Sequence, residues 1–117
     1  MKYLLLLYDD AATVAAMTAA DRRAMVDDHI GYATMLRERG AHRAGEPLDS
    51  PETARTLRFG DGEEPVVTDG PFLEAKEALG GFYLLECASD EEAMELAKRV
   101  PRSPGLVAAE LRPIPEI

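Results

Sequence analysis

The segment TDGPFLEAKEALGGFYLLE, residues 68–86, carries the most information about the fold of this chain. The Asp-Gly pair at 69–70 is a turn signal, and the proline after it has a backbone angle suited to the first position of a helix. The charged side chains that follow predict one helical turn, with Glu74, Lys76 and Glu77 beside the next strand. The segment therefore predicts a turn, a short helical turn and a buried strand without a spacer between them.

Strands are predicted on both sides of this segment. Residues 2–8 and 81–87 carry apolar side chains at both parities, which is typical of strands that are covered on both faces. The chain also has a closing apolar stretch, and Asp, Gly and Pro separate several short β-rich stretches. These predict further strands over 42–48, 53–59, 65–68 and 106–114, with a hairpin loop at 60–65.

Two helices are predicted between the strands. The first begins at Thr18, whose hydroxyl forms a capping box with Asp21, and ends at Gly40. The second begins at Ser89 and ends before Pro101. Two right-handed strand–helix–strand units place both helices on one face of a sheet, so the other face is left bare. A bare apolar face normally marks an interface, and we expect a second copy of the chain to cover it.

The composition of the chain limits the classes of protein to which it can belong. The 117 residues fit one domain, 1–117, and the net charge of -9 disfavours direct binding to nucleic acid or anionic lipid. The apolar run at 4–7 is too short for an export signal, and no stretch approaches the ~20 residues of a membrane span. The one cysteine, Cys87, excludes an internal disulfide and is expected in the core. We therefore expect a cytoplasmic protein.

The chain resembles the DGPF proteins of the YCII-related family. The resemblance rests on TDGPF, E-x-K-E and LGGFY within 68–86, and it extends to residues 1–8, 29–47 and 107–114. It implies an α+β fold of the ferredoxin-like type, with an antiparallel sheet and two long helices on one face, paired as a dimeric α/β barrel. Members of the family are mostly without an assigned reaction.

Two residues are candidates for catalysis. His29 lies in the apolar stripe of the first helix, near carboxylates, where an imidazole can act as an acid or base near neutral pH. The resemblance implies a role for a histidine at this position, and a structural, hydrogen-bonded histidine is the alternative. Asp69 on its tight turn can be held toward a cleft, although a structural role as a helix cap is favoured.

Four further residues are candidates for substrate binding. Glu74 and Glu77 are expected to line the same cleft, with Lys76 as a contact for an anion, and a solvated helical face is the alternative. Arg43 is placed at the mouth of the pocket, with a surface position on a strand as the favoured alternative. The chain has no HxxxH or CxxC motif and no phosphate-binding or dinucleotide-binding loop, so we predict no metal and no organic cofactor.

Two functions follow from these residues. The first is a cofactor-independent enzyme of the lyase or isomerase type, which uses acid–base chemistry on a small molecule in a dimer-associated pocket. The second is a non-catalytic module that senses a ligand or regulates a partner. The resemblance implies an alternative sigma factor as that partner, because DGPF proteins are often encoded beside such factors.

Overall fold

The computed structural model describes all residues, 1–117. Its elements follow the order strand, two helices, short strands, strand, helix, strand. Their bounds are β1 (Lys2–Asp10), α1 (Ala11–Ala15), α2 (Ala19–Glu38), β2 (His42–Pro47), η1 (Pro51–Thr53), β3 (Arg55–Arg58), β4 (Val66–Asp69), β5 (Glu77–Glu86), α3 (Asp90–Lys98) and β6 (Leu106–Ile114).

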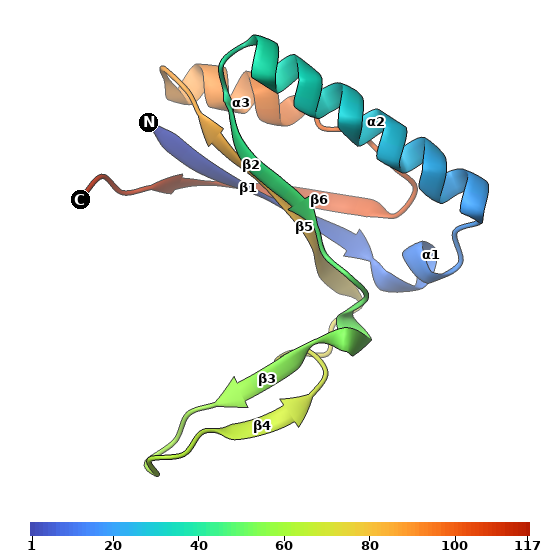
Figure 1. Cartoon of the computed structure of the whole chain (residues 1–117), viewed down its shortest axis with the longest axis vertical. Helices are drawn as coiled ribbons and strands as arrows, with labels where there is room; N and C mark the ends of the chain where they lie inside the picture. Colours follow the sequence, from blue (N-terminus) through green and yellow to red (C-terminus); the bar gives the residue numbers. More distant parts are fainter.

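Four strands form the main sheet in the order β2-β5-β1-β6, and each neighbouring pair is antiparallel. Helices α2 and α3 both lie on one face of this sheet (Figure 1). Helix α2 joins β1 to β2, and helix α3 joins β5 to β6, so two strand–helix–strand units interleave. This is the ferredoxin-like arrangement, and the predicted α+β fold class is confirmed.

Local signals set the ends of α2 as predicted. The Thr18 hydroxyl accepts a hydrogen bond from the Asp21 amide at 3.1 Å, and the Asp21 carboxylate accepts one from the Thr18 amide at 3.2 Å. At the other end, Gly40 has a φ of 70°, a left-handed conformation that glycine adopts without steric cost. The helix therefore begins and ends where its capping residues require.

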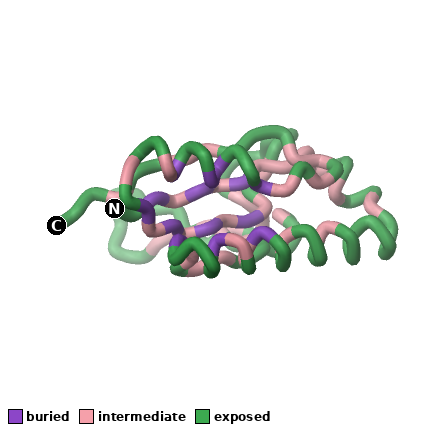
Figure 2. The backbone as a smooth tube through the Cα atoms, turned by 90° about the horizontal axis from the view of Figure 1, so that it is seen from above, coloured by how far each residue is buried: buried purple, intermediate pink, exposed green.

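The core lies between the helices and the sheet, where the buried backbone segments of Figure 2 gather. Leu5 and Leu85 from the central strands and Leu36 from α2 are fully buried there. The hydroxyl of Tyr32 on α2 donates a hydrogen bond of 2.7 Å to the carbonyl of Leu96 on α3, which joins the two helices. Cys87 is buried in the same cluster, as its sequence context predicted.

The opposite face of the sheet is covered by no other element of the chain (Figure 1). Leu4 lies opposite Leu84 and Leu6 lies opposite Phe82 on the two central strands, and all four side chains are only half-buried. This set of four is called the open face below. The bare apolar face that the strand pattern predicted is therefore present.

Strands β3 and β4 form a separate two-stranded sheet. This hairpin, residues 55–69, projects from the body on the side away from the helices (Figure 1). Residues 59–65 form its loop, one residue longer than the predicted 60–65, because β3 ends at Arg58.

The predicted helical turn after the hairpin is wrong. Residues 70–76 contain bends and no helix. They return the chain from the hairpin to β5, where the Ala11 amide donates a hydrogen bond of 3.0 Å to the Lys76 carbonyl. An extended chain covers about 3.3 Å per residue, whereas a helix covers only about 1.5 Å. Residues 70–76 connect the hairpin to β5, and an extended chain spans that connection with fewer residues than a helix, which opposes the local preference for helix.

Two short elements were not predicted. Asp10 caps α1 by accepting a hydrogen bond of 3.1 Å from the Thr13 amide, and η1 makes one turn at the base of the hairpin. No helix of the chain is long and apolar enough to cross a membrane.

The core assignment predicts different costs for two neighbouring positions on α3. Leu96 is fully buried, so Leu96→Ala should lower the free energy of unfolding by about 2–5 kcal/mol through lost burial and a cavity. Met94 is 48% exposed, and Met94→Ala should cost less than about 1 kcal/mol. Urea denaturation measures both, and equal losses would contradict this packing.

Candidate functional site

A cavity of about 740 Å³ lies between α2 and the helix-covered face of the sheet. Residues from α1, α2, β1, β2 and β5 line it together with the segment at the base of the hairpin. Its volume is in the range of small-molecule sites. Its lining is partly apolar, and its ionisable side chains are Asp9, Arg22, His29, Arg37, His42, Glu46, Glu52, Asp49 and Tyr83.

The central polar contact of this cavity joins His29 on α2 to Tyr83 on β5. Nδ1 of His29 lies 2.6 Å from the Tyr83 hydroxyl, a hydrogen-bond distance, and the two rings stack at a centroid separation of 5.9 Å. Gly45 on β2 leaves room for the tyrosine, because a Cβ there would lie 2.6 Å from Tyr83 Cδ1. Tyr32 also packs edge-on against Tyr83 at 5.0 Å.

Burial favours the neutral form of both members of this pair. Loss of contact with water lowers the pKa of His29, an effect that the nearby Asp28 carboxylate opposes. Burial also raises the pKa of Tyr83 to about 12, against the influence of Arg37. A neutral imidazole next to a protonated phenol is an arrangement that can accept and donate protons.

Asp9 at the end of β1 is a third ionisable group of the cavity wall. Partial burial raises the pKa of its carboxyl group. The carboxylate packs against Gly80, where an added Cβ would lie 1.9 Å from Asp9 Oδ2. The register between β1 and β5 shifts at this point, from Leu7 opposite Gly81 to Tyr8 opposite Leu79. Gly80 is therefore the extra residue of a β-bulge.

Positive groups also line the cavity. Arg37 is the side chain whose charge acts on both Tyr83 and His42, and in both cases it favours a lower pKa. The His42 ring lies edge-on to Tyr83 at 6.4 Å. Arg22, at the other end, donates a hydrogen bond of 3.0 Å to the Val14 carbonyl. The two arginines therefore supply separate positive charges to a lining that also holds the carboxyl groups of Asp9, Glu46, Asp49 and Glu52.

The structure places His29 in the cavity, but it does not bring the other predicted site residues to it. Asp69 ends β4, Glu74 and Lys76 lie on the return segment, and Glu77 begins β5, and all four are exposed. None of them is among the residues that line the cavity. Because no helix follows Asp69, the expected cap is also absent. These groups lie near the base of the hairpin or on it.

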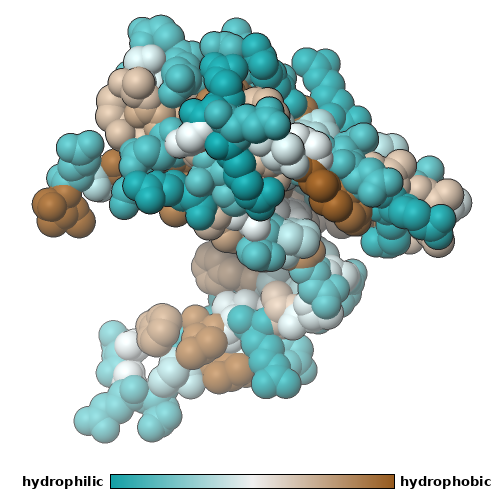
Figure 3. All heavy atoms as spheres, turned by 45° about the horizontal axis from the view of Figure 1, so that its top comes forward, coloured by the Kyte–Doolittle hydropathy of each residue, from teal (hydrophilic) through white to brown (hydrophobic).

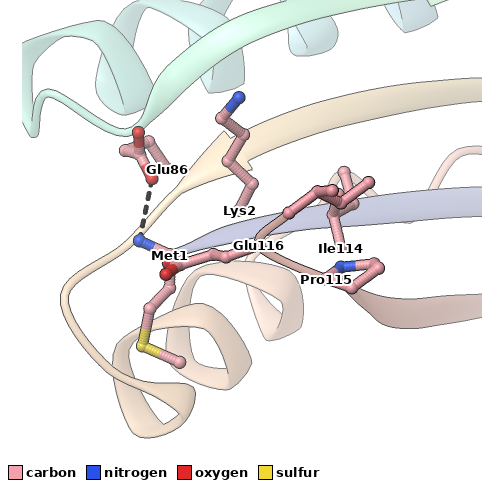
Figure 4. Close-up of a pocket in the computed structure, with 7 residues that line it drawn as sticks. Met1, Lys2, Glu86, Ile114, Pro115 and Glu116 are labelled. Carbon is pink, nitrogen blue, oxygen red and sulfur yellow. Dashed lines mark hydrogen bonds and ion pairs between the residues drawn. The ribbon is translucent and has the colours of Figure 1, made fainter.

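Arg43 is an exposed residue of β2, the position favoured for it from the sequence. Its guanidinium donates a hydrogen bond of 2.8 Å to Glu86, which also pairs with the chain's terminal ammonium at 2.9 Å. Both contacts lower the pKa of Glu86 to about 2, with the bond from Arg43 as the larger cause. Glu86 borders a smaller hollow of about 480 Å³ near both chain ends, where Figure 4 shows the pair with Met1.

Sequence reasoning missed Tyr83, Asp9 and Arg37 as site residues. Tyr83 was assigned only to a buried strand, and Asp9 only to the end of the first apolar run. The tyrosine hydroxyl was the available signal, because a buried phenol normally has a hydrogen-bond partner. No group of three or more His, Cys, Asp or Glu side chains is positioned to hold a metal ion.

Comparison with known proteins identifies the class. A sequence profile of the YCII-related domain matches residues 1–114. An uncharacterized protein of Rhizobium meliloti (strain 1021) is 34% identical over 115 residues, which cover 97% of this chain and 92% of that protein. The chain belongs to the YCII-related family. Its place among the DGPF proteins stays a prediction from residues 68–72.

A solved structure with a similar fold is 5-chloro-2-hydroxyhydroquinone dehydrochlorinase of Burkholderia phenoliruptrix AC1100, in complex with 2,5-dihydroxybenzoquinone. It is 18% identical, with a TM-score of 0.49, and the match covers 98% of this chain and 94% of that one. At this level of similarity we transfer no activity from it.

The environment of His29 predicts its titration. Because burial lowers its pKa, the midpoint in an NMR titration should lie below the ordinary value of about 6.5. Asp28→Asn should lower it further, since Asp28 raises the pKa, whereas Asp27→Asn serves as the neighbouring control. The unfolded chain binds this proton more readily, so His29 should reduce stability as the pH falls below about 6.5. A midpoint above 6.5 would contradict the assigned burial.

Proposed function

We propose that this protein is an enzyme that moves a proton on a small molecule bound beside His29, a reaction of the lyase or isomerase type. The observation that carries the proposal is the 2.6 Å contact between His29 and Tyr83 on the wall of a ligand-sized cavity. A histidine that acts as a general base must be unprotonated at working pH and held in place. His29 meets both requirements, since burial disfavours its cation and Tyr83 fixes its ring.

The pair supports two complementary states. When Nδ1 carries the proton and donates it to the Tyr83 oxygen, Nε2 has a free lone pair and acts as the base. Once Nε2 has taken a proton from the substrate, the ring is an imidazolium, which acts as the acid. It returns that proton from Nε2 to another substrate atom or to a leaving group, and the neutral ring with a proton on Nδ1 is restored.

Arg37 suits a substrate that carries partial negative charge on the side of the cavity near Tyr83 and His42. Arg37 lies near enough to Tyr83 and His42 to influence both, and it forms no ion pair within the chain. An enolate or phenolate formed by proton removal is stabilised by such a cation. Asp9, with its raised pKa, is placed to hold a polar group of the substrate through a hydrogen bond.

We also propose a homodimer, in which the open face of one copy packs on that of another. Leu4, Leu6, Phe82 and Leu84 supply its apolar centre. Ion pairs on neighbouring positions, Arg43 with Glu86 and Arg112 with Glu110, neutralise charge at its margin. Two copies with a net charge of -9 can then approach here with less repulsion.

The ligand-sensing or regulatory module is the second candidate. It uses the same cavity without turnover, and the acidic charge suits a basic partner. Native mass spectrometry after incubation with a cell metabolite extract detects a retained compound, and incubation at length shows whether that compound is converted. Capture of a sigma factor that persists in a His29 variant would favour the regulatory module.

Two substitutions test the catalytic proposal on the compound that is converted. His29→Asn should lower kcat by about 10²–10⁴-fold through loss of the proton acceptor. Tyr83→Phe removes one hydrogen bond of about 1–1.5 kcal/mol and should cost about tenfold. Steady-state kinetics measures both, and circular dichroism confirms folding. If His29→Asn retains full turnover, the mechanism is wrong.

Asp69→Asn examines the other catalytic residue predicted from the sequence. Within one copy Asp69 lies outside the cavity, so this variant should keep its turnover unless another copy's hairpin reaches the site. A loss as large as that of His29→Asn would assign the hairpin a direct part in the reaction.

A further inference from the structure

The hairpin of residues 55–69 lacks the packing that normally supports such an element. Strands β3 and β4 pair only with each other, through four residue pairs from Arg55 opposite Asp69 to Arg58 opposite Val66. None of its residues is buried. An isolated two-stranded hairpin is marginally stable in water at best. A hairpin that stands this far from its own core therefore needs another surface.

The hairpin carries an apolar surface that is suited to such a contact. Leu57 and Val67 lie opposite each other on one face, 51% and 58% exposed, and Phe59 beyond them is 81% exposed. Apolar residues gather on the hairpin in Figure 3, whereas the visible surface of the body above it is mostly hydrophilic. Phe72 on the return segment is 62% exposed and lies under the Arg58 guanidinium at 5.2 Å.

The total exposed surface of the chain exceeds that of a compact protein of the same mass. The chain exposes 8203 Å², whereas a compact protein of 12.8 kDa exposes about 6,300 Å². The excess of about 1,900 Å² is more than the ~800 Å² that each partner buries in a standard interface. The radius of gyration, 16.1 Å, likewise exceeds the ~13 Å of a compact chain of this length.

A second copy of the chain is the occupant that fits. The hairpin projects on the same side of the sheet as the open face, so the two surfaces form a concave angle (Figure 1). A copy packed on the open face would fill that angle. Arg55 and Arg58 form no ion pair within the chain, and the partner copy, with its net charge of -9, offers carboxylates to them.

We infer that the hairpin crosses to a second copy and holds it, with Leu57, Phe59 and Val67 buried against the partner. This inference rests on the proposed homodimer and adds a second contact to it. It also gives a role to the segment that begins at Asp69-Gly70, which returns the chain from the hairpin to the sheet and lies outside the cavity. The two hairpins of a symmetric dimer would make equivalent contacts.

Photo-crosslinking from the hairpin tests this contact directly. Phe59 is replaced by benzoylphenylalanine in the full chain, and ¹⁴N-labelled and ¹⁵N-labelled protein are mixed before irradiation. The expected product is a covalent dimer of mixed isotope content, joined through residue 59. Benzoylphenylalanine at Met94, an exposed apolar position on α3, is the matched control and should give no such product.

The outcomes separate the two proposals. A dimer by light scattering that gives no crosslink from position 59 overturns the hairpin contact and leaves the open-face dimer standing. A monomeric wild-type protein overturns both. Neither result bears on the kinetics of the His29 variants.

The affinity of the two copies for each other supplies a second test of the hairpin contact. Leu57→Asp places a carboxylate in the proposed contact and should raise the dimer dissociation constant about tenfold or more in sedimentation equilibrium. Met94→Asp should leave it unchanged. Circular dichroism checks that both variants fold, and equal dissociation constants for Leu57→Asp and the wild type would overturn the inference.

Discussion

The position of Tyr83 is the constraint on which the rest of the structure depends. Its ring stands on the helix-covered face of a central strand, where Gly45 leaves the space for it. From there it packs edge-on against Tyr32, which in turn binds the Leu96 carbonyl, so one aromatic pair joins the sheet to both helices. The hydroxyl of the same tyrosine meets His29. Core packing and the geometry of the cavity are therefore coupled through one side chain.

Most of the fold could be predicted because its signals are local. The capping box at Thr18 and the cap at Ser89 begin the two long helices, and the left-handed Gly40 ends the first of them, each through contacts within a few residues. The prediction of a helical turn after residue 70 was wrong because the conformation there is not set by local signals. There the chain must bridge the gap between a projecting hairpin and the sheet, a demand that no short window of sequence records.

The cavity was less accessible to sequence reasoning. His29 could be found because the apolar stripe of its helix points it toward the sheet. Its partner Tyr83 is 54 residues away, and the contact depends on strand pairing and on a glycine in a third strand. Asp69 drew attention because an aspartate in a turn is conspicuous, yet it ends β4 at the base of the hairpin with an exposed side chain that does not line the cavity. Burial, which sets the pKa of His29 and Asp9, is a property of the assembled fold.

The bulge at Gly80 has a consequence beyond the space it leaves for Asp9. Side chains alternate between the two faces of a strand. The extra residue Gly80 therefore reverses which face of the sheet the side chains of residues 77–79 point to, relative to the rest of β5. Deletion of Gly80 would move the side chains of residues 77–79 to the opposite face of the sheet. It would also rotate the base of the hairpin toward that face. The direction in which the hairpin leaves the body is thus set by the length of a strand and not by the hairpin's own sequence. An insertion or deletion at Gly80 of this chain would therefore redirect the hairpin, whereas a substitution within the hairpin would change what it contacts.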